Sequence, residues 1–248
     1  MTTQEKPVIV LLHGAWHIPL HYRALIDRLR VSGYTVFAPY QVTTGYDDSI
    51  NDKTYVDSTN QIRDYLRPLL GQGRKIVIVA HSAGGIVATG AAIGSTLEDR
   101  SSQGLQGGIV GIVYISALIE PQHGRTDKPM PFPPGWTDYK KRPFPEDLAL
   151  MLLYDDIEES RQKGALQMLH LQSEATCDPD RPQTASDVRA PKTYVVCTKD
   201  KIVPPEKQYQ RAAAAGATIV ELDCGHSPFL LDKETEVLLD VITKVANV

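Results

Sequence analysis

Hydrophobic residues fall into short continuous runs that alternate with longer segments of helical period. The runs are rich in β-branched side chains, as in KIVIVA and TYVVCT, and predict strands at residues 8–12, 35–38, 75–80, 109–117, 193–198 and 218–222. Apolar positions recurring every three or four residues predict helices at residues 21–30, 55–70, 86–94, 205–215 and 233–246. Strands that alternate with helices form sheets covered on both faces. The pattern therefore predicts an α/β fold with a mostly parallel central sheet of about six strands, flanked by helices.

Residues 118–190 interrupt this alternation. They contain no convincing strand, but they hold a proline-rich run, PMPFPPGW, and helical patterns at residues 146–154 and 157–171. Such a segment is too long for an ordinary connection. We expect an α/β core formed by residues 1–117 and 191–248, with residues 118–190 inserted before the penultimate strand as a helical cap. A cap over the carboxyl edge of the sheet would cover the place where open α/β sheets bind ligands. An extra helical layer away from any site is the alternative.

Composition narrows the classes of partner. The 248 residues carry a net charge of −4 without a basic block, so neither nucleic acid nor a membrane surface is expected as a partner. Cys177, Cys197 and Cys224 are odd in number and form no CxxC pair, which argues against a disulfide framework or a structural zinc site. The first apolar run, at residues 8–12, is too short for a secretion leader or a membrane span, so we expect a soluble cytoplasmic protein.

The strongest candidate for chemistry is the sequence Ala80-His81-Ser82-Ala83-Gly84-Gly85, between a predicted strand and a predicted helix. A serine on a tight strand-to-helix turn is exposed at the sheet edge as a nucleophile, and small residues at Ala80 and Gly84 let strand and helix pass closely. The following helix N-terminus favours developing negative charge. The alternative is that Ser82 only caps this helix.

A serine nucleophile needs a base, and the base needs an acid to orient it. His226 follows the last predicted strand and Asp200 follows the one before it. The carboxyl ends of parallel strands lie at one edge, so both residues can converge on Ser82. A capping role for His226 and a turn role for Asp200 are the alternatives. Glu120, after the strand at residues 109–117, is a rival acid.

Backbone donors for an oxyanion are expected from two turns. The first strand ends at Leu12-His13-Gly14-Ala15-Trp16, where a His-Gly turn can aim the N–H of Ala15 at a substrate oxygen. The second donor is the N–H of Ala83, after the candidate nucleophile. Apolar residues near this turn and in the proline-rich run suggest a pocket, although packing within the cap would explain them too. The residues expected to line the pocket are Gly14, Trp16, Met130, Phe132 and Trp136.

Metal and cofactor signals are weak. His13, His17 and His21 are spaced like helical metal ligands, but Pro19 argues against one continuous helix there. Gly71-Gln72-Gly73 precedes a strand instead of following one, and neither a P-loop nor an HExxH motif is present. We expect no metal and no cofactor.

Four strings taken together, HGAW, AHSAGG, DKIVPP and GHSPFL, resemble the α/β-hydrolase superfamily over essentially the whole chain. Within it, the sequence is most similar to the compact esterase branch of plant methylesterases and hydroxynitrile lyases. The resemblance implies Ser82 as nucleophile, Asp200 as acid, His226 as base, and the amides of Ala15 and Ala83 as oxyanion donors.

Two departures favour an esterase over a lyase. Hydroxynitrile lyases of this branch carry a lysine after the histidine and a threonine in the oxyanion turn, and these positions are Ser227 and Gly14 here. We therefore expect a serine hydrolase that cleaves a carboxylic ester, lactone or thioester of a small to medium apolar metabolite. A cofactor-free lyase, retro-Claisen or cyclisation enzyme, or a catalytically idle ligand receptor, are the alternatives. The sequence indicates a small-molecule substrate but no oligomeric state.

Overall fold

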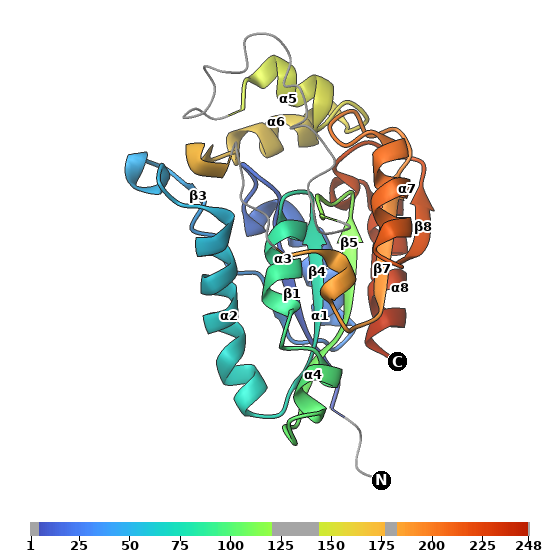
Figure 1. Ribbon diagram of the computed structural model, residues 1–248. Coiled ribbons are helices and arrows are strands. Elements are labelled where there is room, and N and C mark those ends of the chain that lie inside the picture. The colour runs from blue at the N-terminus through green and yellow to red at the C-terminus, as the bar shows by residue number, and fades with distance from the viewer. Residues whose placement is uncertain (1–4, 121–143, 177–182, 248) are drawn as a thin grey trace.

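The computed structural model describes residues 5–120, 144–176 and 183–247 of the chain. Its main strands are β1 (Val8–Leu12), β2 (Val36–Phe37), β4 (Lys75–His81), β5 (Gly108–Ile115), β7 (Lys192–Cys197) and β8 (Thr218–Leu222). Within the described residues they form one six-stranded sheet in the order β2-β1-β4-β5-β7-β8 (Figure 1). Every neighbouring pair in this sheet is parallel. The mostly parallel sheet predicted from the sequence is confirmed.

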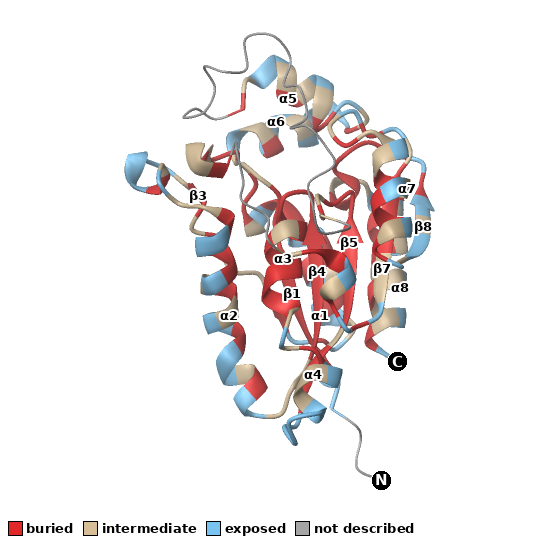
Figure 2. Cartoon of the chain, in the orientation of Figure 1, coloured by how far each residue is buried: buried red, intermediate tan, exposed pale blue. Residues whose placement is uncertain are grey.

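Helices cover both faces of the sheet. They are α1 (Arg23–Val31), α2 (Tyr55–Gly71), α3 (Gly84–Ala92), α7 (Pro205–Ala214) and α8 (Asp232–Ala246). A further short helix, α4 (Leu97–Ser101), precedes β5. Side chains of α2, α3 and α7 join one hydrophobic cluster with the sheet. Side chains of α1 and α8 join a second cluster on the other face. The sheet is thus the middle of three layers. Its central strands β1, β4 and β5 are buried along almost their whole length, whereas the edge strand β8 is mostly exposed (Figure 2).

The first strand shows why these runs are continuously apolar. Val8, Val10 and Leu12 belong to the cluster on the α2–α3 face, whereas Ile9 and Leu11 belong to the cluster on the α1–α8 face. Successive side chains of a strand point to opposite faces. A strand with a helix layer on each side therefore needs apolar residues at every position.

Several boundaries and short elements differ from the prediction. β5 ends at Ile115 because Ser116 has a positive φ of 43° and turns the chain. α1 begins at Arg23, after a separate 3-10 turn at Pro19–Tyr22. The helix α4 was not predicted, since its five residues hold no buried side chain and carry no helical stripe.

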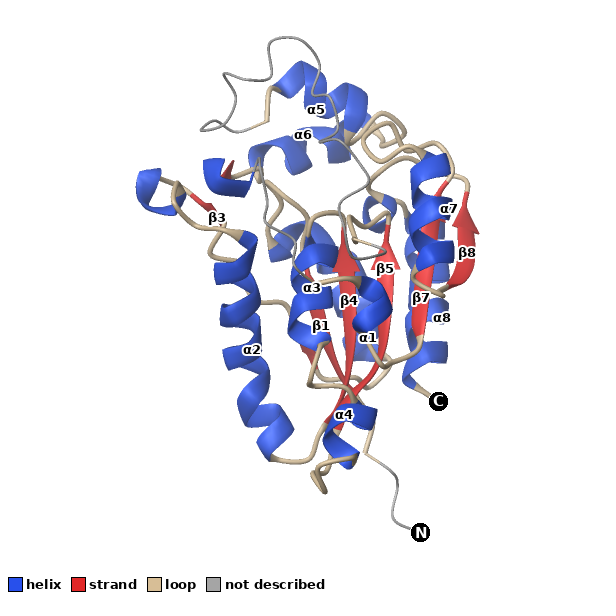
Figure 3. Ribbon diagram, in the orientation of Figure 1, coloured by secondary structure: helices blue, strands red, loops and turns tan. Residues whose placement is uncertain are grey.

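The inserted segment, defined here as residues 116–191 between β5 and β7, contains α5 (Glu146–Leu152) and α6 (Glu159–Gln167). It also contains β6 (Leu171–Gln172), which pairs antiparallel with β3 (Thr44–Gly45). The expectation of no strand between residues 118 and 190 was therefore wrong, because two residues are too few to show a strand period. Figure 3 shows α5 and α6 above the carboxyl ends of β4 and β5.

The inserted segment has its own apolar cluster, built around Phe144, Leu153, Tyr154 and Leu169. Trp16, from the turn after β1, packs against that cluster and so joins it to the sheet edge. The division into core and cap stays a prediction. In the part of the chain that the structure describes, no helix is long and apolar enough to cross a membrane.

Candidate active site

Ser82 occupies a tight turn between the end of β4 and the start of α3. Its φ of 51° is positive, a conformation that is uncommon for a residue with a side chain. The backbone at the end of β5 fixes this turn: Ser82 N–H donates to the carbonyl of Ile115, and the Ser82 carbonyl accepts from the N–H of Leu118 at 2.8 Å. Strained residues held in this way cluster at functional sites. The structure therefore places Ser82 on a tight strand-to-helix turn of the kind that the sequence predicts.

Two glycines allow the turns after β1 and β4 to touch. A Cβ on Gly84 would lie 2.6 Å from the carbonyl oxygen of Leu12, so only glycine fits between the two backbones. A Cβ on Gly14 would lie 2.8 Å from Nδ1 of His81 and 3.0 Å from Cβ of Ser82. The turn after β1 therefore lies directly against the turn that carries Ser82.

The two predicted oxyanion donors lie on these adjoining turns. Ala15 directly follows Gly14, and Ala83 is the N-cap residue of α3. Among the described residues, neither the Ala15 N–H nor the Ala83 N–H has a hydrogen-bond acceptor. Amides without an intramolecular partner at a helix N-terminus can bind an anion.

Asp200 and His226 are in direct contact at the ends of β7 and β8. Nδ1 of His226 lies 2.8 Å from Oδ2 of Asp200, and both side chains are almost completely buried. Because the carboxylate accepts from Nδ1–H, the other ring nitrogen, Nε2, is free to take a proton. The carboxylate that contacts His226 is therefore that of Asp200. The backbone carbonyl of the rival acid, Glu120, accepts from the N–H of Ala185 at 2.8 Å.

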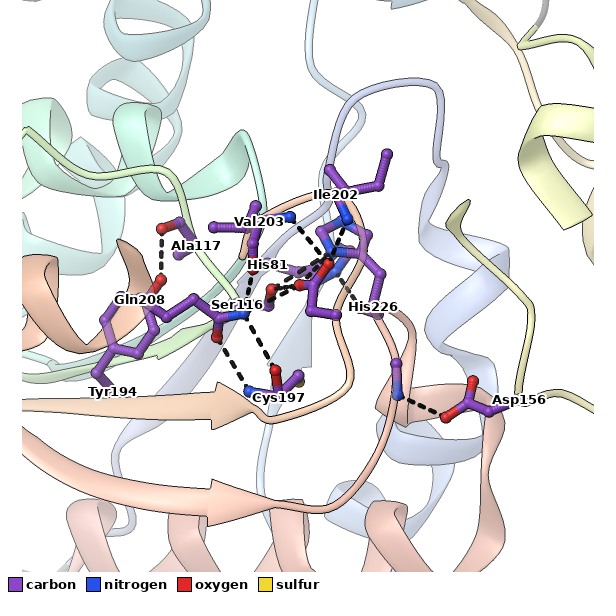
Figure 4. A network of polar contacts seen from close by, with 12 residues as sticks. His81, Ser116, Ala117, Asp156, Tyr194, Cys197, Ile202, Val203, Gln208 and His226 are labelled. Carbon is purple, nitrogen blue, oxygen red and sulfur yellow. Dashed lines mark hydrogen bonds and ion pairs between the residues drawn. The ribbon is translucent and has the colours of Figure 1, made fainter. Parts of the chain in front are cut away.

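Further donors hold the Asp200 carboxylate in place (Figure 4). The backbone N–H groups of Ile202 and Val203 donate to Oδ1 at 2.8 and 2.9 Å. The hydroxyl of Ser116 and the amide of Gln208 donate to Oδ2. A carboxylate with so many donors cannot rotate without leaving buried groups unpaired.

Ser116 and Gln208 were not predicted from the sequence. The sequence pattern predicted Ser116 to lie inside the strand at residues 109–117, but β5 ends at Ile115, directly before it. Its hydroxyl also lies 3.3 Å from Nδ1 of His226. Gln208 lies on the buried face of α7, where it bonds to both backbone groups of Cys197. Neither residue belongs to a sequence motif, but a polar residue on an apolar helix face was a usable signal for Gln208.

His81 directly precedes Ser82 in the sequence, and its ring packs against His226. Its ring centroid is 4.6 Å from that of His226, and its Nε2 is 2.9 Å from the His226 carbonyl. A carbonyl only accepts, so Nε2 carries the proton and Nδ1 accepts from the hydroxyl of Tyr22 at 2.7 Å. Burial, together with the nearby His226, lowers the pKa of His81 well below its usual value and keeps the ring neutral.

The three histidines spaced by four residues are also buried, and each ring has backbone partners. His13 accepts from the N–H of Gln41, His17 contacts the Ala15 carbonyl, and His21 contacts the Ala165 carbonyl of α6. Burial lowers the pKa of His13 to about 4 and that of His21 to about 4. Over the described ranges, no group of three or more His, Cys, Asp or Glu side chains is arranged to hold a metal.

Of the predicted pocket residues, Gly14 and Trp16 lie within the described structure. Trp16 has a positive φ of 61°, and its ring packs edge-on against Phe144 with centroids 4.7 Å apart. The backbone N–H of Trp16 donates to the side-chain oxygen of Gln172 in β6. Trp16 therefore lies between the turn after β1 and the inserted segment. The other predicted pocket residues, Met130, Phe132 and Trp136, lie outside the described residues.

Cys197 and Cys224 are free and buried. They lie just before Asp200 and His226 in the sequence. Cys177 lies outside the described residues. The thiol of Cys224 and burial raise the pKa of Cys197, which keeps it protonated. Cysteines in such a state are unreactive.

Comparisons with known proteins agree with this geometry. The model of the alpha/beta hydrolase family matches residues 9–240, so the chain belongs to that family. The chain is 26% identical to alpha/beta hydrolase nvfD from Aspergillus novofumigatus over 234 residues, which cover 91% of each protein. The sequence-based resemblance is thus confirmed, and the chain is an enzyme of the alpha/beta-hydrolase class.

Solved structures show the same fold. An extracellular alpha/beta-hydrolase from a Paenibacillus species, described as a structural and functional homologue of tobacco salicylic acid binding protein 2, superimposes with a TM-score of 0.76 at 18% identity, over 98% of this chain and 100% of the other. The methylesterase MES16 from Arabidopsis superimposes with a TM-score of 0.74 at 16% identity, over 97% and 99%.

Proposed function

We propose that this enzyme hydrolyses a carboxylic ester, lactone or thioester through an acyl-enzyme on Ser82. The observation that carries the proposal is the 2.8 Å contact between Nδ1 of His226 and Oδ2 of Asp200. It fixes the imidazole tautomer whose Nε2 can take a proton. The strained Ser82 turn supplies the nucleophile that such a base activates.

The proposed reaction has two halves. Nε2 of His226 takes the proton of Ser82 Oγ as this oxygen attacks the substrate carbonyl, and Asp200 stabilises the imidazolium that forms. The N–H groups of Ala15 and Ala83 donate to the oxyanion, and each such donor contributes about 3 kcal/mol to transition-state stabilisation. The histidine then protonates the leaving alkoxide or thiolate. Water, activated by the same histidine, hydrolyses the acyl-enzyme and restores Ser82.

The turn after β1 favours ester hydrolysis over cyanohydrin chemistry. Hydroxynitrile lyases of the similar branch carry threonine where this chain has Gly14. A Cβ at Gly14 would approach Nδ1 of His81 to 2.8 Å, so the turn as packed here has no room for a threonine. The esterase names of related proteins, such as the Arabidopsis methylesterase, point in the same direction.

Apolar groups near the site favour a small to medium apolar substrate. Trp16, from the turn after β1 that adjoins the Ser82 turn, packs against Phe144 of the inserted segment. We propose that the inserted segment acts as a cap and that Trp16 lines the pocket under it. Pockets of metabolite-binding enzymes are lined mainly by such side chains.

A panel of short-chain and aromatic esters, lactones and thioesters tests the proposed activity. We expect hydrolysis of at least one class by the wild type. Ser82→Ala and His226→Ala should each lower kcat by about 10⁴-fold or more while leaving the circular dichroism spectrum unchanged. Wild-type activity in Ser82→Ala would refute the acyl-enzyme mechanism.

A further inference from the structure

Two consecutive aspartates in the turn between α5 and α6 contact both loops that carry Asp200 and His226. Oδ2 of Asp156 accepts a hydrogen bond of 2.6 Å from the N–H of Gly225 (Figure 4). Oδ2 of Asp155 lies 2.7 Å from Nζ of Lys201. Gly225 directly precedes His226, and Lys201 directly follows Asp200. The inserted segment therefore reaches the neighbours of both members of the acid–base pair.

Gly225 allows this close contact. A Cβ at Gly225 would lie 2.9 Å from Oδ1 of Asp155 and 2.9 Å from Oδ1 of Asp156, so both carboxylates lie against bare backbone. Gly225 is itself buried. A buried N–H without an acceptor is costly, and here the acceptor comes from a residue 69 positions away in the sequence.

The two contacts differ in strength. The Lys201 side chain is 50% exposed and that of Asp155 is 22% exposed, and ion pairs near solvent contribute little. The Asp156 contact is a charge-assisted hydrogen bond, which is roughly twice as strong as a neutral one. Within the described part of the chain, the other oxygen of Asp156 is buried without a hydrogen-bond partner. The hydrogen bond to Gly225 therefore stabilises a carboxylate whose burial would otherwise be unfavourable.

We propose that Asp156 is a positioning residue, which holds the loop of His226 from the inserted segment. The inference rests on the proposed role of His226 as the base. The hydrogen bond fixes the backbone one residue before the imidazole, and a displacement of about 1 Å at a catalytic group can lower a rate 100-fold. Asp155 and Lys201 give a weaker second attachment on the loop of Asp200.

The test compares the rate at which a fluorophosphonate probe labels Ser82 in Asp156→Ala, Asp156→Asn and Asp232→Ala. Asp156→Ala removes the acceptor and should slow labelling by about 10- to 100-fold. Asp156→Asn keeps an oxygen acceptor for Gly225 N–H and should restore most of the rate. Asp232→Ala is the matched control, because Asp232 pairs with Arg161 of α6 at 2.7 Å and joins the inserted segment to α8 instead. It should label like the wild type.

Three results would overturn the proposal: a wild-type rate in Asp156→Ala, an equal loss in Asp232→Ala, or no rescue in Asp156→Asn. Hydrogen exchange of the Gly225 amide, followed by NMR, gives a second readout. Its protection should be lost in Asp156→Ala and kept in Asp156→Asn, and unchanged protection in Asp156→Ala contradicts the proposal. If the wild type is not labelled at all, the proposed hydrolase mechanism fails, and the exchange measurement still decides whether Asp156 holds the loop.

Discussion

The hydroxyl of Tyr22 lies 2.7 Å from Nδ1 of His81 and connects two parts of the site. The same hydroxyl accepts a hydrogen bond of 3.0 Å from the N–H of Gly14. His81 in turn donates to the carbonyl of His226. A chain of buried hydrogen bonds therefore runs from the turn of Ala15, one of the proposed oxyanion donors, through a tyrosine and a neutral histidine, to the backbone of the proposed base.

Tyr22→Phe removes the hydroxyl from this chain and leaves Gly14 N–H and His81 Nδ1 without partners. Without these hydrogen bonds the turn of Gly14 and the backbone of His226 can shift, and a displacement of about 1 Å at a catalytic group can lower a rate 100-fold. We therefore expect kcat to fall by about 10- to 100-fold, with KM nearly unchanged. The comparison is Tyr114→Phe, which removes an equally buried hydroxyl that bonds to Thr89 at 3.0 Å. Steady-state kinetics on both variants provide the check, and equal losses in kcat would contradict a specific role for Tyr22.

Asp200→Asn tests which carboxylate orients His226. Asparagine would present an N–H or a weaker acceptor to Nδ1 and disturb the tautomer, so kcat should fall by about 10⁴-fold, by analogy with the protease triad. Glu120→Gln should leave kcat near the wild-type value. The opposite pattern, a mild loss at Asp200 and a severe loss at Glu120, would assign the acid to Glu120.

Gly84→Ala tests the close approach of the two turns. The added Cβ would lie 2.6 Å from the backbone oxygen of Leu12, and overpacking of this kind lowers the free energy of unfolding by about 1–3 kcal/mol. Gly71→Ala is the control: nothing lies within 4 Å of the added methyl group, and alanine favours the helix. Urea denaturation should show a loss for Gly84→Ala alone. Equal stability of the two variants would contradict the predicted clash.

The buried histidines predict acid lability. His13, His17, His21 and His81 are neutral in the folded chain, because burial lowers each pKa from 6.5, to about 4 for His13 and His21. In the unfolded chain each histidine takes up a proton below its usual pKa of 6.5, whereas in the folded chain it does so only near its lowered pKa. The contribution of the neutral rings to stability is therefore full above pH 6.5 and is lost progressively as pH falls from 6.5 through the folded pKa.

Each such histidine contributes a slope of up to about 1.4 kcal/mol per pH unit to the free energy of unfolding. Urea denaturation between pH 7.5 and 5 avoids most of the titration of carboxylates, whose pKa values lie near 4. We expect stability to fall steeply below about pH 6.5. A constant free energy of unfolding over this range would show that the rings are not held neutral.

The sequence predicts the sheet well because its central strands β1, β4 and β5 are buried on both faces and are therefore almost continuously apolar. It also predicts the short distance between Asp200 and His226, since both follow parallel strands that end at one edge. It does not predict Tyr22, Ser116 or Asp156. Their contacts depend on how separate elements pack, and no local spacing records that Asp156 lies against Gly225. The division into core and cap and the role of each site residue stay predictions.

A fluorophosphonate probe tests the central claim, that Ser82 is a nucleophile activated by His226. The wild type and His226→Ala would be treated in parallel, and the labelled peptide would be located by mass spectrometry. We predict rapid labelling of Ser82 in the wild type that collapses in the histidine variant. A folded wild-type protein that is not labelled at Ser82 would contradict the account and favour a non-covalent lyase or a ligand receptor.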